Sequence, residues 1–365
     1  MKYFESARAV AAWSIGCVMF FSAFAGDSRA CTTFKFSTEG RSFVAKNYDW
    51  DKEQGMLYVN KRGVSKQSLK VFANDQVLEW TSKFGSLTFN QYGRELPNAG
   101  MNEAGLVVEV MELGTSRFET AGAKSSVNES QWVQFMLDNA ASVEDVKALS
   151  KNIRISKILV PLHYMVCDTD GSCAAFESLN GRLLITDQVQ PDTAVLTNHT
   201  YAESMTYLGQ FAGFGGSRNP PAGDGSLERF ARAATFVKNS QLARVSSFDV
   251  EDGFEGLSAV ETSITQWSIV YDLGRRQIAF KSRSSRALKS VQLNNFDLGC
   301  SSPVMGFPII SRDSGDVSAM FRPYSDQLNR QLVESSLAGD VPRQLIEAAA
   351  NLPGSTQCIS SMDPN

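Results

Sequence analysis

Residues 31–50, CTTFKFSTEGRSFVAKNYDW, alternate apolar and polar side chains on both sides of a Glu39-Gly40 turn. Phe34 and Phe36 give the first strand its apolar face, and residues 43–45 begin a second strand. Alternation of period two around a glycine-containing turn predicts a β-hairpin. The hairpin begins at Cys31, so this cysteine is the first residue of the predicted fold.

The first thirty residues have the composition of a secretory signal. Lys2 and Arg8 precede an apolar stretch from about residue 9 to residue 25, and Ser28-Arg29-Ala30 has small residues where a signal peptidase reads. We expect cleavage after this triplet and a periplasmic or secreted mature chain of residues 31–365. Serine and glycine interrupt the apolar stretch, whereas a membrane span needs about 20 apolar residues. We therefore expect no stable membrane anchor.

A cysteine directly after a cleavage site is also the residue that carries the lipid in envelope lipoproteins. A lipidated cysteine normally follows a Leu-small-small triplet, whereas Arg29 places a bulky cation in this triplet. A non-enzymatic lipoprotein anchored at Cys31 is therefore the weaker alternative.

The charge balance and the short motifs narrow the class of partner. The chain has 35 basic and 39 acidic residues and no long charge run, which indicates a small-molecule partner and no nucleic acid. No Walker loop or dinucleotide fingerprint occurs. The stretch Cys167-Asp168-Thr169-Asp170-Gly171 supplies too few ligands for zinc or calcium. We predict no cofactor and no metal.

The cysteines predict one free thiol. Cys17 lies in the leader, and the cysteines that remain are odd in number: Cys31, Cys167, Cys173, Cys300 and Cys358. In an oxidising compartment four of them can pair and one stays free. The turn-like stretch between Cys167 and Cys173 suits a cross-hairpin bridge, and pairing Cys300 with Cys358 has no independent support. We expect Cys31 to be the cysteine that stays unpaired.

The rest of the chain alternates strand-like and helix-like segments. Helices are predicted at residues 129–139, 143–149, 227–242 and 248–257, with Ser142 as a helix cap. Residues 98–105 are predicted as a glycine-rich turn, and residues 213–225 as a loop that covers the substrate. Further strands are predicted at residues 57–59, 69–72, 77–81, 87–91, 106–111, 155–166, 174–177, 183–185, 194–197, 266–271 and 277–281. This order predicts helices outside two stacked sheets in a single domain, residues 31–365.

The small number of histidines in the chain limits which residue could act as the base for a cysteine nucleophile. His163 and His199 are its only histidines, so a cysteine nucleophile needs another proton acceptor. A free α-amine titrates near pH 7.7 to 8.0 and a free thiol near 8.5, so an N-terminal cysteine carries its own base. The predicted cut creates this arrangement at Cys31.

Several motifs then resemble a known family. They are Cys31-Thr32-Thr33-Phe34, Asn47-Tyr48-Asp49-Trp50, residues 100–106 (GMNEAGL), Leu196-Thr197-Asn198, Arg229-Phe230-Ala231-Arg232 and Thr265-Gln266-Trp267-Ser268. In this order and spacing the chain is similar to the choloylglycine hydrolase family, linear amide C-N hydrolases that include bile salt hydrolases and penicillin V acylases. The resemblance implies an α+β N-terminal nucleophile (Ntn) hydrolase fold, a four-layer αββα sandwich of two antiparallel sheets between helical layers.

The resemblance also implies the roles of five residues. Cys31 attacks the amide carbonyl, and Lys46 stands where most relatives have an arginine that favours the thiolate. Lysine is a compact charge without the planar fork of arginine. Asp49 matches the aspartate that holds the α-amine. Asn198 matches the oxyanion donor, and Arg229 matches the arginine that closes the hydrogen-bond network beside the cysteine.

Two further positions are implied to contact the substrate. The second oxyanion donor is a backbone N–H near Glu112, where relatives carry asparagine or tyrosine, and Trp267 resembles an aromatic residue that flanks the acyl pocket. Plainer interpretations exist for some of these residues. Asp49 could form a surface pair with Lys46, Asn198 could be a turn residue, and Trp267 could be a core aromatic.

The resemblance implies hydrolysis of a linear amide through a thioester. Substrates of the resembling enzymes are penicillin V, conjugated bile salts, N-acyl amino acids and acyl-homoserine lactones, and the sequence does not choose among these N-acyl amides. An acyltransferase of the same fold is the alternative within enzymes. Members of the family are often tetramers, so the resemblance allows a homotetramer.

Overall fold

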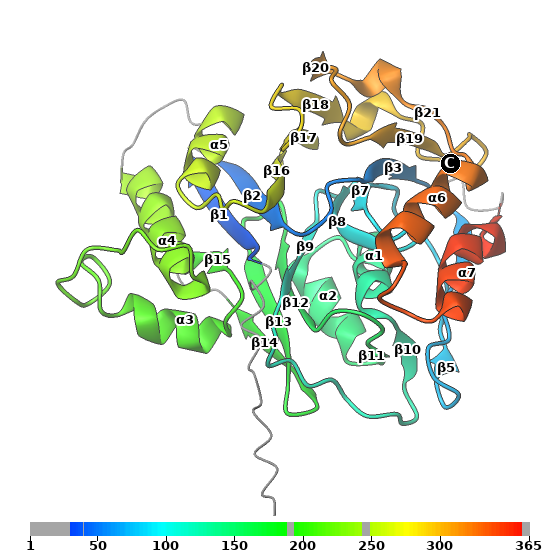
Figure 1. Ribbon diagram of the computed structural model, residues 1–365, viewed down its shortest axis with the longest axis horizontal. Coiled ribbons are helices and arrows are strands. Elements are labelled where there is room, and N and C mark those ends of the chain that lie inside the picture. Colours follow the sequence, from blue (N-terminus) through cyan, green and yellow to red (C-terminus); the bar gives the residue numbers. More distant parts are fainter. Residues whose placement is uncertain (1–29, 39, 188–192, 243–248, 360–365) are drawn as a thin grey trace, which may run out of the picture.

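The computed structural model describes residues 30–38, 40–187, 193–242 and 249–359 (Figure 1). The predicted leader lies outside these residues except for Ala30. The predicted hairpin is confirmed, because β1 (Thr32–Thr38) and β2 (Arg41–Asp49) pair in antiparallel register with Thr33 opposite Lys46. The hairpin forms because one face of both strands is apolar and buries against a helical layer and the other against a second sheet.

The hairpin belongs to a seven-stranded, mainly antiparallel sheet with the order β15-β1-β2-β16-β17-β18-β20. The other strands of this sheet are β15 (Val195–Leu196), β16 (Thr265–Asp272), β17 (Gln277–Ser282), β18 (Lys289–Gln292) and β20 (Gly315–Asp316). In this sheet β1, the strand that directly follows Cys31, lies between the edge strand β15 and β2.

A nine-stranded antiparallel sheet, β14-β13-β12-β9-β8-β7-β3-β19-β21, lies against the first sheet. Its strands are β3 (Met56–Asn60), β7 (Ser86–Asn90), β8 (Pro97–Asn102), β9 (Val107–Glu112), β12 (Leu162–Cys167), β13 (Cys173–Leu179), β14 (Arg182–Asp187), β19 (Met305–Pro308) and β21 (Arg322–Pro323). Two small sheets complete the strands: β4 (Val64–Gln67), β6 (Glu79–Thr81) and β22 (Gln357–Cys358), and β5 (Gln76–Val77), β10 (Ser125–Val127) and β11 (Ile153–Ile155).

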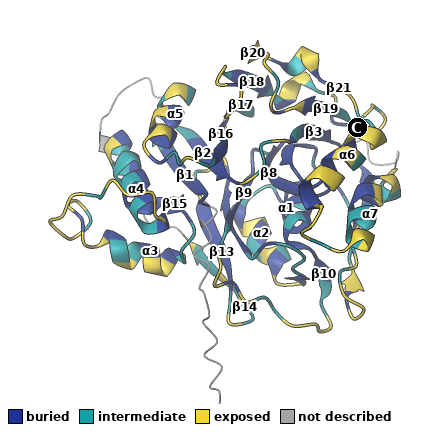
Figure 2. Cartoon of the chain, in the orientation of Figure 1, coloured by how far each residue is buried: buried dark blue, intermediate teal, exposed yellow. Residues whose placement is uncertain are grey.

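Helices cover the outer faces of both large sheets (Figures 1 and 2). α4 (Ser226–Leu242) packs on β1, α5 (Val250–Ser258) packs on β2 and β16, and α3 (Tyr201–Leu208) packs on α4. On the other side α1 (Glu129–Asn139) packs on β8 and β9, with α2 (Val143–Ser150) beside it. The predicted αββα Ntn-hydrolase architecture is confirmed. Its buried residues concentrate in the strands, as Figure 2 shows.

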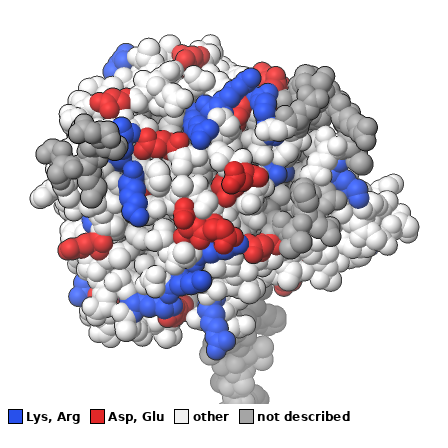
Figure 3. Space-filling model, turned by 180° about the vertical axis from the view of Figure 1, so that it is seen from behind, with Lys and Arg blue, Asp and Glu red and all other residues white. Residues whose placement is uncertain are grey.

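Helix boundaries match the local signals. Asn128 caps α1 by accepting from the backbone N–H groups of Ser130 and Gln131, and Ser142 caps α2 as predicted. The face of the molecule turned away from the viewer in Figure 1 carries interspersed acidic and basic side chains (Figure 3).

Three predicted elements are wrong. The strand predicted at residues 155–166 is interrupted, because β11 ends at Ile155 and β12 begins only at Leu162. Residues 69–72 form no strand, because the N–H of Leu69 donates to the Gln131 side chain and that of Phe72 to Asp75. Residues 98–102 continue β8, so the predicted turn is confined to the residues before Gly105. A Cβ on Gly100 would lie 2.7 Å from the Leu87 carbonyl oxygen, so this glycine permits close packing rather than a turn.

The C-terminal part adds helices that local patterns did not predict. α6 (Asp326–Leu337) and α7 (Arg343–Asn351) pack on each other, and in Figure 1 they lie beside α1, on the side of the molecule opposite α3, α4 and α5. Short 3-10 helices precede α6 at η2 (Leu293–Asn295) and η3 (Ser318–Met320), and another follows α7 at η4 (Leu352–Ser355).

Candidate active site

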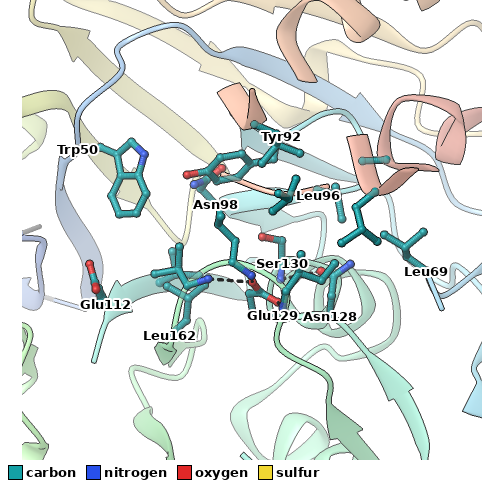
Figure 4. A pocket seen from close by; sticks show the side chains of 18 of the residues that line it. Trp50, Leu69, Tyr92, Leu96, Asn98, Glu112, Asn128, Glu129, Ser130 and Leu162 are labelled. Atoms are coloured by element: carbon teal, nitrogen blue, oxygen red, sulfur yellow. Dashed lines mark hydrogen bonds between the residues drawn. The ribbon is translucent and has the colours of Figure 1, made fainter. Parts of the chain in front are cut away.

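A cavity that is partly open to solvent reaches from Cys31 to the C-terminal helices, and its empty space, with the open solvent at its mouth included, is about 670 Å³. Figure 4 shows Trp50 and Glu112 at one end and Leu69 and Asn128 at the other. The cavity is lined by Cys31, Tyr48, Trp50, Leu69, Tyr92, Leu96, Asn98, Val110, Glu112, Asn128, Glu129, Ser130, Ile158, Leu159, Val160, Leu162, Leu337, Val341, Leu345 and Ala349.

Cys31 is the free thiol among the described cysteines. The bridge Cys167–Cys173, which the turn between these residues suits, is present, and Cys300 is bridged to Cys358, a pairing that the sequence left open. The Cys31 side chain is buried, and its Sγ lies 3.8 Å from the Asp49 carbonyl oxygen.

The charges around Cys31 act in opposite directions. Burial raises the pKa of the Cys31 thiol, the positive charges of Lys46 and Arg229 oppose this rise, and the charge of Asp49 adds to it. Because the net direction is upward, the resting group is the thiol rather than the thiolate. Nucleophilic chemistry at this sulfur therefore requires a base.

Arg229 connects the start of β1 to the start of α4. Its side chain is fully buried, and Nη1 donates to the Cys31 carbonyl oxygen at 2.7 Å and to the Thr32 hydroxyl. Nη2 donates to Asn198 Oδ1 at 2.9 Å. A guanidinium suits this place because its planar fork holds several acceptors at once. Arg229 thus fixes the positions of both Cys31 and Asn198.

The amide of Asn198 lies beside the end of β9. Asn198 Nδ2 donates to the Glu112 carbonyl oxygen at 2.9 Å, and the Asn198 backbone N–H donates to Ser226 Oγ. The next residue, Leu113, donates its N–H to Pro161 on the β12 side. Since successive residues of a strand direct their polar groups to opposite sides, the Glu112 N–H points to the same side as its carbonyl and the Asn198 amide.

Asp49 is the last residue of β2 and lies next to Cys31. Oδ1 accepts from the Thr265 hydroxyl, and Oδ2 is buried and has no hydrogen-bond partner within the described part of the chain. Burial raises the pKa of Asp49 to about 6, although Thr265 and the charges of Arg229 and Lys46 lower it. An unpaired buried carboxylate oxygen is costly, which indicates a place for a cation or donor.

Lys46 pairs with Glu109 and not with Asp49, so the surface-pair alternative is wrong. Lys46 Nζ lies 3.4 Å from Glu109 Oε2 and donates to the Val110 carbonyl oxygen, with both side chains buried between the sheets. The Tyr271 hydroxyl donates to Glu109 Oε1 at 2.7 Å. Glu109 and Tyr271 were not among the residues that the sequence predicted for the site. A single acid inside the apolar run of residues 106–111 was the signal, because a charge on a buried strand needs a partner.

Two sequence expectations about the cavity are corrected. Trp267 is 1% exposed, stacks on Tyr48 at 4.5 Å and does not line the cavity, so it is a core residue. A bulge between Thr265 and Trp267 in the pairing with β2 sets this orientation. The loop at residues 213–225 contributes no lining residue either. It is held beside α4, where Arg232 donates to the carbonyl oxygens of Pro221 and Gly223.

Within the described ranges, no cluster of three His, Cys, Asp or Glu side chains is arranged to hold a metal. His163 instead bridges Glu177 and the Thr197 carbonyl oxygen in the core. None of the helices described here has the length and apolar character needed to cross a membrane.

Comparisons with known proteins give a family match and related structures. The family model described as "Linear amide C-N hydrolases, choloylglycine hydrolase family" matches residues 31–306. Penicillin V acylase of Pectobacterium atrosepticum is 28% identical over 233 residues, 58% of this chain. The match spans 61% of that relative, less than two thirds of its length.

Solved structures show the shared fold. Penicillin V acylase from Agrobacterium tumefaciens aligns with a TM-score of 0.70 and 24% identity over 81% of this chain and 98% of that chain. A variant of conjugated bile acid hydrolase from Clostridium perfringens aligns with a TM-score of 0.65 and 18% identity over 78% of this chain and 98% of that chain.

Proposed function

Because the chain belongs to the linear amide C-N hydrolases of the choloylglycine hydrolase family, we propose that it cleaves an N-acyl amide with Cys31 as its N-terminal nucleophile. The observation that carries this proposal is the position of Cys31. It is the free thiol among the described cysteines, and it lies at the edge of a cavity beside the buried side chains of Arg229 and Asp49, with the half-buried Asn198 bound to Arg229. No cofactor is needed for this chemistry.

The proposed base is the α-amine that cleavage after Ala30 creates on Cys31. The amine lies two bonds from the Cys31 side chain and takes the thiol proton as Sγ attacks the amide carbonyl carbon. The unpaired Oδ2 of Asp49 accepts a hydrogen bond from this amine and stabilises its protonated form. The raised pKa of the Cys31 thiol makes such a base necessary.

The oxyanion that forms needs donors already in place. The Asn198 Nδ2 group and the Glu112 backbone N–H share one side of β9, which supports their pairing as the oxyanion hole. One donor of this kind is typically worth about 3 to 4 kcal/mol in the transition state. A backbone donor at Glu112 does not depend on the identity of the side chain.

The reaction then closes in two balanced steps. The ammonium of Cys31 gives its proton to the leaving nitrogen as the C–N bond breaks, which releases the amine and leaves a Cys31 thioester. Water next attacks the thioester carbonyl, with the α-amine taking its proton. The C–S bond then breaks, the thiol is restored and the carboxylic acid leaves. An acyltransferase would differ only in accepting an amine in place of this water.

We also propose that the protein acts in the periplasm or outside the cell. Its two disulfides suit an oxidising compartment, and the composition of residues 1–30 suits export. The substrate class proposed is an N-acyl amide of the penicillin V, conjugated bile salt, N-acyl amino acid or acyl-homoserine lactone type.

The test combines maturation and turnover. Intact mass and N-terminal sequencing of the exported protein should begin at Cys31, and Cys31→Ala should abolish amide hydrolysis while its urea unfolding midpoint stays near that of the parent. Added hydroxylamine should not replace water as the main acceptor if the protein is a hydrolase. Full turnover by Cys31→Ala, or by a chain that still begins at Met1, would overturn the mechanism.

A further inference from the structure

The end of the cavity away from Cys31 is formed by the C-terminal helices. Leu337 at the end of α6, Val341 in the connection, and Leu345 and Ala349 on α7 all line it. These residues lie beyond the family match, which ends at residue 306. Helix ribbons border the Leu69 end of the cavity in Figure 4. The region shared with the family therefore supplies the chemistry, and this segment supplies the far wall.

We propose that α6 and α7 form a wall that sets acyl-chain length and selects amides with long, uncharged acyl groups. This inference rests on the proposed hydrolase function, because it assigns the far cavity to the acyl group. The wall residues are specificity determinants and take no part in bond breaking.

Three polar side chains that line the cavity are engaged in hydrogen bonds with the rest of the protein. Glu129 accepts from the backbone N–H groups of Ile158, Leu159 and Val160. Asn128 caps α1, and Asn98 accepts from the Gln91 backbone and donates to the Tyr48 hydroxyl. Because these hydrogen bonds hold the walls in place, the remaining contact surface of the far cavity consists mainly of aliphatic side chains. Aliphatic walls bind methylene groups.

The charge of the lining excludes one class of acyl group. Glu112 and Glu129 are its acidic residues, and none of the described lining residues is lysine, arginine or histidine. A second carboxylate at the end of an acyl chain would be buried there without a cation, which is strongly unfavourable. A dicarboxylic half-amide should therefore be a poor substrate compared with a fatty amide of equal length.

The wall is firmly attached to the loops that border the cavity. Asn329 on α6 accepts from the Arg94 backbone N–H and donates to the Ala350 carbonyl oxygen on α7. Lys52 donates to the carbonyl oxygens of Ser335 and Ser336 at the end of α6. These hydrogen bonds attach α6 to the backbone at Arg94 through Asn329 and to Lys52 through the end of the helix.

Two more features hold the pair in place. Gly93 has φ +106, and a Cβ there would lie 2.7 Å from Val333 on α6, so the loop approaches the helix closely. The Cys300–Cys358 bridge ties the chain that follows α7 to the loop after β18. A wall held this way has a defined position, which is what length selection requires.

The test is a substrate series on the processed wild-type protein. Butanoyl-, hexanoyl-, octanoyl- and decanoyl-glycine are compared by glycine release, and kcat/KM should rise about fourfold for each methylene that becomes buried. The half-amide of sebacic acid with glycine, which has the ten acyl carbons of decanoyl-glycine but a carboxylate in place of the terminal methyl group, should react at least about tenfold more slowly than decanoyl-glycine. A flat series, or equal rates for these two amides, would overturn the proposal.

Leu345→Trp tests the wall itself. Leu345 is partly buried and lines the cavity, so an indole there shortens the space for the chain, and the decanoyl-to-butanoyl ratio of kcat/KM should fall about tenfold. Leu328→Trp is the matched control, since Leu328 lies on α6 but is exposed and does not line the cavity. An unchanged ratio in Leu345→Trp, or an equal fall in the control, would overturn the role of the wall.

Binding of decanoic acid, measured by titration calorimetry, separates this inference from the proposed function, because it needs no hydrolysis. Leu345→Trp should weaken the Kd of decanoic acid about tenfold and Leu328→Trp should not. If wild type cleaves no amide of any of the proposed substrate types, the proposed function fails, and binding of decanoic acid alone decides the role of the wall. If Leu345→Trp does not fold, Leu345→Ala is tested in its place. Leu345→Ala should shift the acyl-chain length with the highest kcat/KM toward dodecanoyl-glycine. An unchanged optimal chain length would overturn the proposal.

Discussion

Replacing Lys46 by methionine tests two roles of this buried lysine at once. Its Nζ lies 3.4 Å from Glu109 Oε2, and the two side chains are 1% and 0% exposed. In Lys46→Met the Glu109 carboxylate keeps the Tyr271 hydroxyl as a donor but loses its cation. The same positive charge lowers the pKa of the Cys31 thiol, so the variant should change both stability and thiol reactivity.

The stability loss should be large because a charge is left buried without its partner. Removing one member of a buried ion pair costs about 3 to 5 kcal/mol of unfolding free energy. Glu109→Gln added to Lys46→Met removes the orphan charge and keeps an acceptor for Tyr271, so the double variant should recover most of this loss. Burial already raises the pKa of Glu109, so the deficit of the single variant should shrink as the pH falls and the carboxylate takes up a proton.

Urea unfolding of the wild type, both single variants and the double variant gives the coupling between the two residues. Iodoacetamide alkylation of Cys31 against pH gives the thiol pKa in the same proteins. The double variant should be near wild type in stability yet alkylate more slowly at neutral pH. A Lys46→Met protein as stable as wild type would refute the ion-pair reasoning, and wild-type alkylation in the double variant would refute any action of Lys46 on Cys31.

Two further outcomes follow from the site. Asn198→Ala should lower kcat by about 10² to 10³ through loss of an oxyanion donor, with KM little changed in steady-state kinetics; an unaltered kcat would remove Asn198 from the mechanism. In the chain that retains Ala30, burial raises the pKa of Asp49 from an ordinary 3.8 to about 6. The ionised carboxylate therefore destabilises the folded state above pH 6. This loss of stability disappears as the pH falls toward 4, because the carboxyl group is then protonated in the folded state. Asp49→Asn should therefore raise the unfolding free energy of that chain, measured by urea titration, by up to about 3 kcal/mol at pH 8 and by almost nothing at pH 4. An equal increase in unfolding free energy at both pH values would contradict this reasoning.

Local patterns predicted the elements whose formation depends on neighbouring residues. The hairpin of β1 and β2 and the bounds of α1 follow from alternation, helical spacing and a cap, and all are present. Residues 69–72 and 98–102 were misread because their backbone partners or packing neighbours lie far away in sequence. The Leu69 amide binds Gln131, and Gly100 is required by the approach of Leu87 and Leu137.

The sequence by itself determined the fold class and the residue on which the proposed mechanism rests. Cys31 stands out because it follows a predicted cleavage site, is the odd cysteine and would carry its own amine. These properties need only composition, order and covalent chemistry. Asp49, Asn198 and Arg229 came from the resemblance, and their folded positions lie around this cysteine.

Only the tertiary structure decided what surrounds these residues. Lys46 faces Glu109 because the two sheets stack with β2 over β9, and Trp267 lies in the core because β16 has a bulge beside β2. α6 and α7 reach the cavity because Lys52, Arg94 and the Cys300–Cys358 bridge hold them there. Periodicity tells which face of a segment is buried, but not which distant segment covers it, since that choice depends on the packing of the whole chain.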